Sequence, residues 1–285
     1  MKIFLTGSNG FLGSKIYDQL SDKHQITKIE KKEQISENFL TFQSFFKTKN
    51  ELFKNNSLLI HSAGCASSNS REKKYKQSDQ FISNEILTRD VLNSAKKKGI
   101  NKIIFFSSSK VYKNNLNKLD ESSPIEDSCF YSRSKIMAEK YCEEYSDETF
   151  KVIVLRLPTI YGKDNKSYLK YFRKLADIAL PLPLKAFDQK KSFVSIYNLL
   201  TIIEFLIIFD WEKFNNFEIF NCSDDEDLSI SELFSTYKKN FHRKDNQFYI
   251  YKSFLKLFFF LINNLKAYET LNHQLRLNVN KLKSL

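Results

Sequence analysis

Five short apolar runs, separated by amphipathic segments, constrain the fold of this chain more than any other feature. The runs are KIFLT (2–6), QITKIE (25–30), SLLIHSA (57–63), KIIFFSS (102–108) and KVIVLRL (151–157). Runs rich in β-branched and apolar residues are typical of strands buried on both faces, as in a parallel sheet. Since helical segments lie between them, the sequence predicts an α/β fold with a doubly wound parallel sheet and right-handed crossovers.

The regular alternation ends near residue 160. The segment YGKDNKSYLKYFRKLADIALPLPL (161–184) has the pattern of a loop and a helix that stop at a proline-rich turn. The apolar segments after it are fewer and less regular. We therefore expect a larger domain over residues 1–160 and a smaller lobe over 161–285, with about 190–223 packing back onto the first domain.

Composition excludes several classes of protein. A chain of 285 residues with 42% hydrophobic and 15% aromatic residues can bury a full core, which argues against disorder. The net charge of +12 comes from lysines spread in short groups such as AKKKG (95–99). This spread favours a solvated basic surface over a nucleic-acid site, and leaves an anionic small substrate or an anionic membrane face as partners.

The two longest apolar stretches are too short to span a bilayer. LLTIIEFLIIF (199–209) and FLKLFFFLI (254–262) fall well below the roughly 20 residues that a spanning helix needs. For 254–262, which contains Lys256, we expect a buried helix rather than one that lies on a membrane surface. Because the first 30 residues lack a cleavable leader pattern, the sequence predicts a cytoplasmic protein.

The four cysteines indicate neither a metal site nor a disulfide. Cys65, Cys129, Cys142 and Cys222 form no CxxC pair and have no histidine at ligand spacing. We expect free thiols in a reducing compartment, and burial is the usual fate of an isolated cysteine.

Three glycines stand between the first strand and the first helix. Gly7, Gly10 and Gly13 give the spacing GxxGxxG, and Glu30 ends the second strand. Residues without a Cβ suit a turn that a pyrophosphate approaches, and the following helix end supplies N–H donors. An acid about 20 residues on can accept hydrogen bonds from ribose hydroxyls. A tight turn without a ligand is the alternative.

Two further motifs suit acid–base chemistry, although a tyrosine and a lysine at the spacing of the first motif also occur by chance on many helices. Tyr131 and Lys135, in FYSRSKIMAEKY, are four residues apart and so share one helical face. A neighbouring ammonium favours the tyrosine phenolate. In FFSSSKVY (105–112), a strand ends in serines at the sheet edge where ligands usually bind, although a serine there could equally cap the next segment.

The order TGxxGxxG, SSSKVY, YxxxK and RLPTIYG resembles the extended short-chain dehydrogenase/reductases. Within them it is similar to the NAD-dependent epimerase/dehydratase family that acts on nucleotide sugars. The resemblance implies a Rossmann-type sheet with a C-terminal substrate-binding lobe, an NAD cofactor, a UDP-sugar substrate, and a homodimer through the YxxxK helix. The segment LPLPLKAFDQKKSFVSIYNL (180–199) resembles bacterial surface-polysaccharide enzymes, both 4-epimerases and 4-ketoreductases, and no residue separates the two.

The resemblance also assigns residues, one position at a time. Its catalytic residues are Ser108, Tyr131 and Lys135. Its substrate-binding residues are Ser108, Tyr131, Thr159 and Lys191. Its cofactor-binding residues are Gly7, Asn9, Gly10, Phe11, Leu12, Gly13, Glu30, Ala63, Asn84, Tyr131, Lys135 and Pro158.

Departures from the family pattern bear on the substrate more than on the chemistry. Lys191 stands where many relatives have a phosphate-binding arginine, which keeps the charge but loses the bidentate fork. Ser109 and Lys110 replace the Asp-Glu pair of the dehydratase branch, so a dehydratase is disfavoured. Glu30 favours NAD, while Lys31 and Lys32 keep NADP as the alternative. A non-catalytic dinucleotide-binding relative is disfavoured because all three catalytic residues are present.

Overall fold

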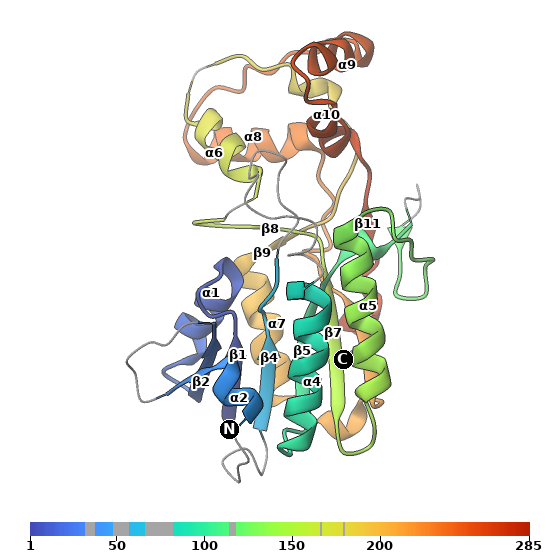
Figure 1. Cartoon of the computed structure of the whole chain (residues 1–285). Coiled ribbons are helices and arrows are strands. Elements are labelled where there is room, and N and C mark those ends of the chain that lie inside the picture. Colours follow the sequence, from blue (N-terminus) through green and yellow to red (C-terminus); the bar gives the residue numbers. More distant parts are fainter. Residues whose placement is uncertain (32–37, 48–56, 66–81, 114–117, 166, 179) are drawn as a thin grey trace.

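The five apolar runs become the centre of one parallel sheet in the computed structural model, which describes residues 1–31, 38–47, 57–65, 82–113, 118–165, 167–178 and 180–285. These strands are β1 (Lys2–Thr6), β2 (Gln25–Glu30), β4 (Ser57–His61), β5 (Lys102–Ser108) and β7 (Lys151–Leu157). Two further strands, β3 (Phe39–Thr41) and β10 (Phe217–Asn221), form the edges. The order is β10-β7-β5-β4-β1-β2-β3 (Figure 1). This doubly wound arrangement confirms the predicted fold class.

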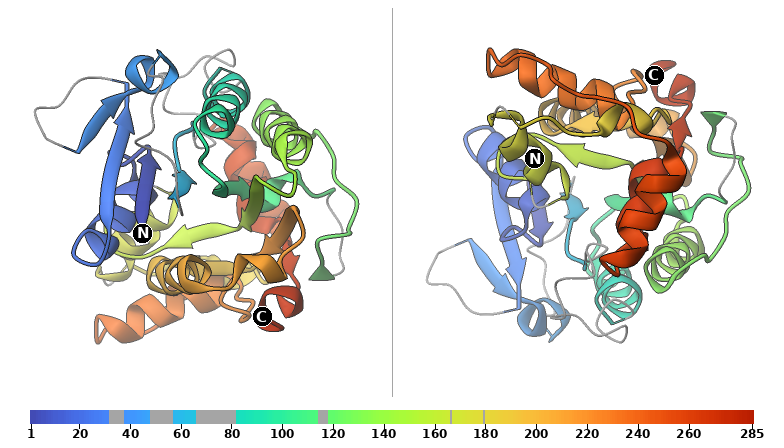
Figure 2. Two further views of the ribbon diagram at one scale, coloured as in Figure 1. Left: turned by 90° about the horizontal axis from the view of Figure 1, so that it is seen from below. Right: turned by 90° about the horizontal axis from the view of Figure 1, so that it is seen from above.

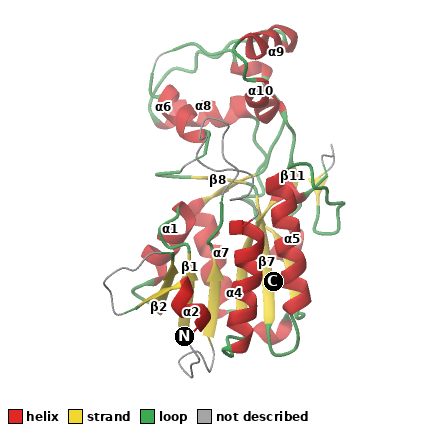
Figure 3. Ribbon diagram, in the orientation of Figure 1, coloured by secondary structure: helices red, strands yellow, loops and turns green. Residues whose placement is uncertain are grey.

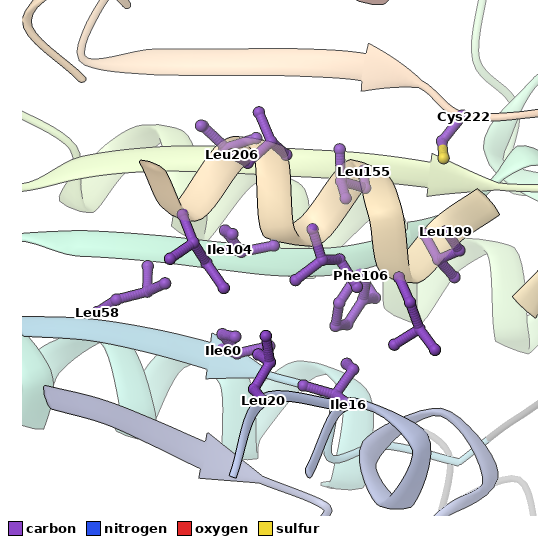
Figure 4. Close-up of a cluster of buried hydrophobic side chains, with 14 of the residues drawn as sticks. Ile16, Leu20, Leu58, Ile60, Ile104, Phe106, Leu155, Leu199, Leu206 and Cys222 are labelled. Carbon is purple, nitrogen blue, oxygen red and sulfur yellow. The ribbon is translucent and has the colours of Figure 1, made fainter. Parts of the chain in front are cut away.

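Helices cover both faces of the sheet. α1 (Phe11–Leu20) and α7 (Ile196–Ile208) pack on one face, and α2 (Phe42–Lys47), α4 (Leu87–Lys97) and α5 (Phe130–Tyr145) pack on the other. A single turn of π-helix, η2 (Ile82–Ile86), leads into α4. Since side chains alternate along a strand, Ile104 and Phe106 join α1 and α7 (Figure 4), whereas Ile103 and Phe105 join α4 and α5.

The C-terminal lobe is mainly helical and lies beyond the carboxyl ends of the strands (Figure 3). It contains α6 (Leu169–Ala176), α8 (Ile230–Asn240), α9 (Lys252–Leu261) and α10 (Leu265–Asn272), which share a separate apolar cluster. Two small parallel ladders join it to the body. They pair β8 (Thr159–Tyr161) with β9 (Phe193–Ser195), and β6 (Lys118–Leu119) with β11 (Arg276–Leu277). The final helix α11 (Asn280–Lys283) then returns to β10.

The expectation of a buried helix at 254–262 was wrong. Leu255 is the one buried residue of α9, because the helix lies at the tip of the lobe and packs along one side only. Within the described parts of the chain, every helix is too short or too polar to cross a bilayer. The four cysteines differ in their exposure to solvent. Cys142 and Cys222 are buried and Cys65 is half-buried, but Cys129 is exposed because it caps the amino end of α5.

Candidate active site

The glycine turn is fixed by close backbone contacts at the carboxyl end of β1. Gly7 has φ +73°, and a Cβ there would stand 2.6 Å from the Ala63 nitrogen. A Cβ on Gly13 would stand 2.1 Å from the Gly7 oxygen. Gly10 begins α1 without a side-chain cap. The turn therefore requires glycine for its own packing, and it leaves the first-turn N–H groups, with the positive end of the helix dipole, available to an anion.

Glu30 lies directly beside this turn. Its Oε1 accepts hydrogen bonds from the Ser8 hydroxyl (2.7 Å) and the Asn9 backbone N–H (3.2 Å). The side chains of Phe11 and Leu12 pack against the body core, so these residues can offer a ligand their backbone N–H groups. The structure thus brings together the predicted cofactor-binding residues of the first two strands, with a buried carboxylate set against an uncapped helix end.

Ser108, Tyr131 and Lys135 form one cluster at the carboxyl end of β5. The Tyr131 hydroxyl is hydrogen-bonded to the side chain of Ser108. Lys135, one helical turn on, donates from Nζ to the Phe106 carbonyl at 2.9 Å. The Ser108 side chain also accepts from the Lys110 backbone N–H at 3.3 Å, so it caps the next segment while it faces the tyrosine. The structure therefore confirms that Ser108 caps the next segment, and it places the same side chain against Tyr131.

Burial sets the protonation states in this cluster. It lowers the pKa of Lys135 to about 8, against the opposing effect of Glu139 and two cysteines. Burial raises the pKa of Tyr131, and the hydrogen bond with Ser108 partly offsets that rise. At neutral pH the site therefore holds a neutral phenol beside a charged lysine, which is a proton donor next to the group that would stabilise its anion.

A buried polar chain that the sequence analysis missed connects the glycine turn to this cluster. The Thr88 hydroxyl donates to the Asn84 carbonyl (2.7 Å), so it must accept from His61 Nε2 (3.0 Å). His61 Nδ1 then accepts from the Thr6 hydroxyl (2.7 Å), which in turn accepts from the Ala63 N–H (3.1 Å). Burial lowers the pKa of His61 to about 3, so the ring is neutral. The available signal was that Thr6 and His61 are the polar residues that end apolar strands.

Asn84 is engaged as a clamp rather than left open. Its side-chain amide pairs with both the N–H and the carbonyl of Cys65, and also donates to Ser134 on α5 (3.1 Å). Ser134 in turn donates to the Tyr131 carbonyl. The predicted cofactor-binding asparagine thus holds the loop after β4 against the helix that carries Tyr131 and Lys135.

A second buried network lies behind the cluster. Glu139, one turn after Lys135, accepts a hydrogen bond from Ser107 and several from Arg156, the shortest at 2.7 Å. Both charged side chains are almost fully buried. Arg156 also lies over the Tyr112 ring. This network joins β5, α5 and β7 directly beneath the reactive residues.

The C-terminal lobe contributes a group of cations at the same end of the sheet. Lys191 is buried and donates from Nζ to the Thr270 carbonyl at the end of α10. Burial, together with the nearby charge of Lys110, lowers its pKa to about 7. Burial lowers the pKa of His273 too, with further contributions from Lys191 and Lys110. Lys266 acts on Lys110 in the same way. Lys191 is buried, whereas Lys110 and Lys266 are exposed, and like charges that repel one another in one place favour the binding of an anion.

The remaining predicted residues, Pro158 and Thr159, lie at the passage from the body to the lobe. Pro158 is buried between β7 and β8. Thr159 is half-buried, and its hydroxyl is hydrogen-bonded to Tyr168. Both are therefore near the lobe interface, with Thr159 already committed to a partner within the lobe.

Comparisons with known proteins identify the family of this chain and confirm its fold. The model of the NAD dependent epimerase/dehydratase family matches residues 3–210. UDP-glucose 4-epimerase of Vibrio cholerae is 30% identical over 251 residues, covering 81% of this chain and 73% of that protein. An Escherichia coli O157:H7 enzyme, N-acetyl-alpha-D-glucosaminyl-diphospho-ditrans,octacis-undecaprenol 4-epimerase, is 26% identical over 55% of this chain and 47% of its own. The solved UDP-N-acetylglucosamine 4-epimerase from Bacillus cereus superposes with a TM-score of 0.75 at 18% identity, over 100% of this chain and 89% of that one.

Proposed function

The chain belongs to the NAD dependent epimerase/dehydratase family, and we propose that it is an NAD-dependent nucleotide-sugar 4-epimerase that acts at C4 of a UDP-sugar. The observation that carries this proposal is the cluster of Ser108, Tyr131 and Lys135 at the carboxyl end of β5, on the side of the sheet that faces the lobe. The family and the relatives support the class of enzyme. The choice of sugar is the part proposed.

The residues around the glycine turn fit a dinucleotide. The uncapped amino end of α1 would receive the pyrophosphate, and Glu30 would accept the ribose hydroxyls. A buried carboxylate there would repel a 2′-phosphate, which favours NAD over NADP. Lys31 is exposed behind Glu30, and Lys32 lies outside the described residues. When bound, the nicotinamide would take a hydride from sugar C4 and return it to the other face.

Each residue of the cluster then has a defined task. The phenol of Tyr131 would first lose its proton to solvent, because the charges of Lys135 and of a bound nicotinamide favour the phenolate. The phenolate oxygen would then take the proton from the sugar C4 hydroxyl as the hydride leaves, and give it back on the return step. Ser108 would hold that same oxygen by a hydrogen bond. Lys135, fixed by the Phe106 carbonyl, would stabilise the Tyr131 phenolate. Acid–base catalysis of this kind contributes about 10²–10⁴-fold.

The cations of the lobe would hold the diphosphate of the substrate. The buried Lys191 and the exposed Lys110 repel each other, and an anion between them would relieve that repulsion. Because the hydroxyl of Thr159 already bonds Tyr168, we assign Thr159 to shaping the sugar pocket from the lobe side.

A second candidate substrate is a sugar carried on a polyprenyl diphosphate, the class printed in the name of the Escherichia coli relative. The exposed apolar surface of α9 favours it. α10, which follows α9 directly, carries Lys266 and the Thr270 carbonyl, so the cations that would hold a diphosphate lie next to that surface. Reduction of a UDP-4-keto-6-deoxy sugar remains the alternative reaction.

The test is turnover of a panel by the purified full chain. UDP-glucose, UDP-N-acetylglucosamine, polyprenyl-diphospho-N-acetylglucosamine in detergent and a UDP-4-keto-6-deoxy sugar are incubated with and without NADH or NADPH. Conversion without added reductant supports an epimerase. Consumption of reductant would assign the reductase alternative, and tight binding without turnover would contradict the proposal.

Tyr131→Phe should lower kcat by about 10²–10⁴-fold while NAD binding, followed by fluorescence, stays within about twofold. Tyr141→Phe is the matched control, because Tyr141 lies on the same helix and away from the cluster. Equal losses in both variants would remove Tyr131 from the chemistry.

A further inference from the structure

α9 carries an apolar face that nothing in the described part of the chain covers. Five of its large side chains and its capping residue are about half exposed or more: Phe254, Leu257, Phe258, Phe260, Leu261 and, as the cap, Ile262, with exposed fractions from 49% for Ile262 to 72% for Leu261. Singly exposed apolar residues are ordinary, but a contiguous patch on one element marks an interaction surface. The helix lies at the end of the lobe farthest from the sheet (Figure 1), and the right-hand view of Figure 2 looks at the molecule from that end.

The arrangement of these side chains is that of an interfacial helix. Phe254, Leu257, Phe258 and Leu261 follow the spacing i, i+3, i+4, i+7 and share one face. The opposite side is anchored, since Leu255 is buried in the lobe core and the Phe259 ring packs 6.0 Å from that of Tyr268 on α10. The apolar face is therefore held outward by packing on its other side.

The charges around α9 favour an anionic partner. Residues 246–268 contain three lysines and no Asp or Glu, in a chain of net charge +12. Lys252 pairs with Asp188 at 2.6 Å, whereas Lys256 has no ion-pair partner among the described residues. Tyr249 and Tyr251, just before the helix, are exposed as well. Exposed apolar residues with flanking aromatics and lysines are the pattern by which a helix lies in the plane of an anionic bilayer.

We propose that α9, with the tyrosines before it, docks flat on the surface of a bilayer that contains anionic phospholipid. A second copy of the chain would compete for the same face, and the experiment below distinguishes it from a bilayer. The proposal does not rest on the proposed function, since it concerns a surface outside the reactive cluster.

Vesicle co-sedimentation of the full chain tests this docking. The vesicles contain either phosphatidylcholine alone or equal parts of phosphatidylcholine and phosphatidylglycerol. We expect binding to the mixed vesicles that weakens with salt, and at least about tenfold weaker partition for the triple variant Phe254→Ser, Phe258→Ser, Leu261→Ser. Lys256→Glu should reduce the preference for anionic vesicles.

A matched triple variant controls for loss of exposed apolar area elsewhere. Tyr171→Ser, Leu180→Ser and Ile208→Ser replace side chains that are each at least half exposed and lie away from α9. This control should bind the mixed vesicles like the parent, and thermal unfolding should show that both triple variants are folded. The proposal is overturned by equal loss in the two variants, by an absence of binding to anionic vesicles, or by a dimer of the parent that the α9 variant converts to monomer.

Discussion

The body buries an ion pair beside its candidate site, whereas the C-terminal lobe exposes an ion pair and an apolar helix face. In the body, the ion pair of Arg156 and Glu139 is 4% and 6% exposed, and further hydrogen bonds surround it. In the lobe, the pair of Arg243 and Asp177 is 53% and 59% exposed, while apolar side chains of α9 face outward. The buried polar groups of the body thus lie next to the cluster of Ser108, Tyr131 and Lys135. In the lobe, this ion pair and the apolar face of α9 are exposed to solvent.

Two buried lysines show the same contrast. Lys135 of the body donates to the Phe106 carbonyl, and the charge of Glu139 lies nearby to favour its protonated form. Lys191 of the lobe faces Lys110, a like charge. The surroundings of Lys135 thus favour its protonated form, whereas the protonated form of Lys191 would be stabilised when an anion binds beside it.

The largest expected effect is on the buried ion pair. Arg156→Met leaves Glu139 buried with its partner removed, so the free energy of unfolding should fall by about 3–5 kcal/mol. Arg243→Met in the lobe should change it by roughly 0–1 kcal/mol, because both partners are solvated. Urea unfolding of the two variants measures both. Similar losses of unfolding free energy in the two variants would show that the buried ion pair of the body contributes no more to stability than the exposed pair of the lobe.

The polar chain through His61 should make the body sensitive to acid. Its pKa is lowered to about 3 in the folded state and stands near 6.5 in the unfolded state. Between these values the unfolded chain binds the extra proton, so stability falls as the pH falls, by up to about 1.4 kcal/mol per unit below 6.5. The comparison is the free energy of unfolding of the parent and of His61→Gln from pH 7 to 5. A variant with the same slope as the parent would show that His61 is not the group responsible.

The smallest effect concerns Lys191 and the binding of UDP-glucose or whichever panel member turns over. Its pKa of about 7 should rise when a diphosphate binds, so affinity should be greatest below pH 7 and weaken by at most about tenfold per unit above it. Calorimetry in buffers of different ionisation enthalpy would detect the accompanying proton uptake.

Lys191→Arg keeps its charge and should flatten that profile. Burial lowers the pKa of His273 below its usual value, so His273 titrates at lower pH than Lys191. Lys110→Arg separates the contribution of Lys110. An unchanged profile in Lys191→Arg would assign the proton uptake to another group.

Much of the body could be predicted from the sequence, because its signals are local. A strand buried on both faces must be apolar throughout, so the five runs marked five strands at nearly their final bounds. The turn of Gly7, Gly10 and Gly13 could be recognised because such a turn requires glycine: a Cβ at two of these positions would overlap the backbone. Tyr131 and Lys135 could be placed on one face because a helix has a fixed period.

The hydrogen-bonded chain through His61 and the exposure of α9 could not be predicted in this way. Thr6 and His61 are polar residues that end apolar strands, but nothing in the sequence pairs them with each other or with Thr88. They meet because β1 and β4 are neighbours in the sheet and α4 lies over them. An apolar helix such as 254–262 has the same composition whether it lies in a core or on a surface.

The sequence by itself therefore determined the sheet, the glycine turn and the pair of Tyr131 and Lys135, since spacing along the chain specifies each of them. Only the tertiary structure decided that Asn84 clamps a loop, that Lys191 faces Lys110, and that α9 points outward. The physical reason is that these depend on which segments become neighbours. Contacts between residues distant in sequence decide whether a polar group finds a partner and whether an apolar face is covered.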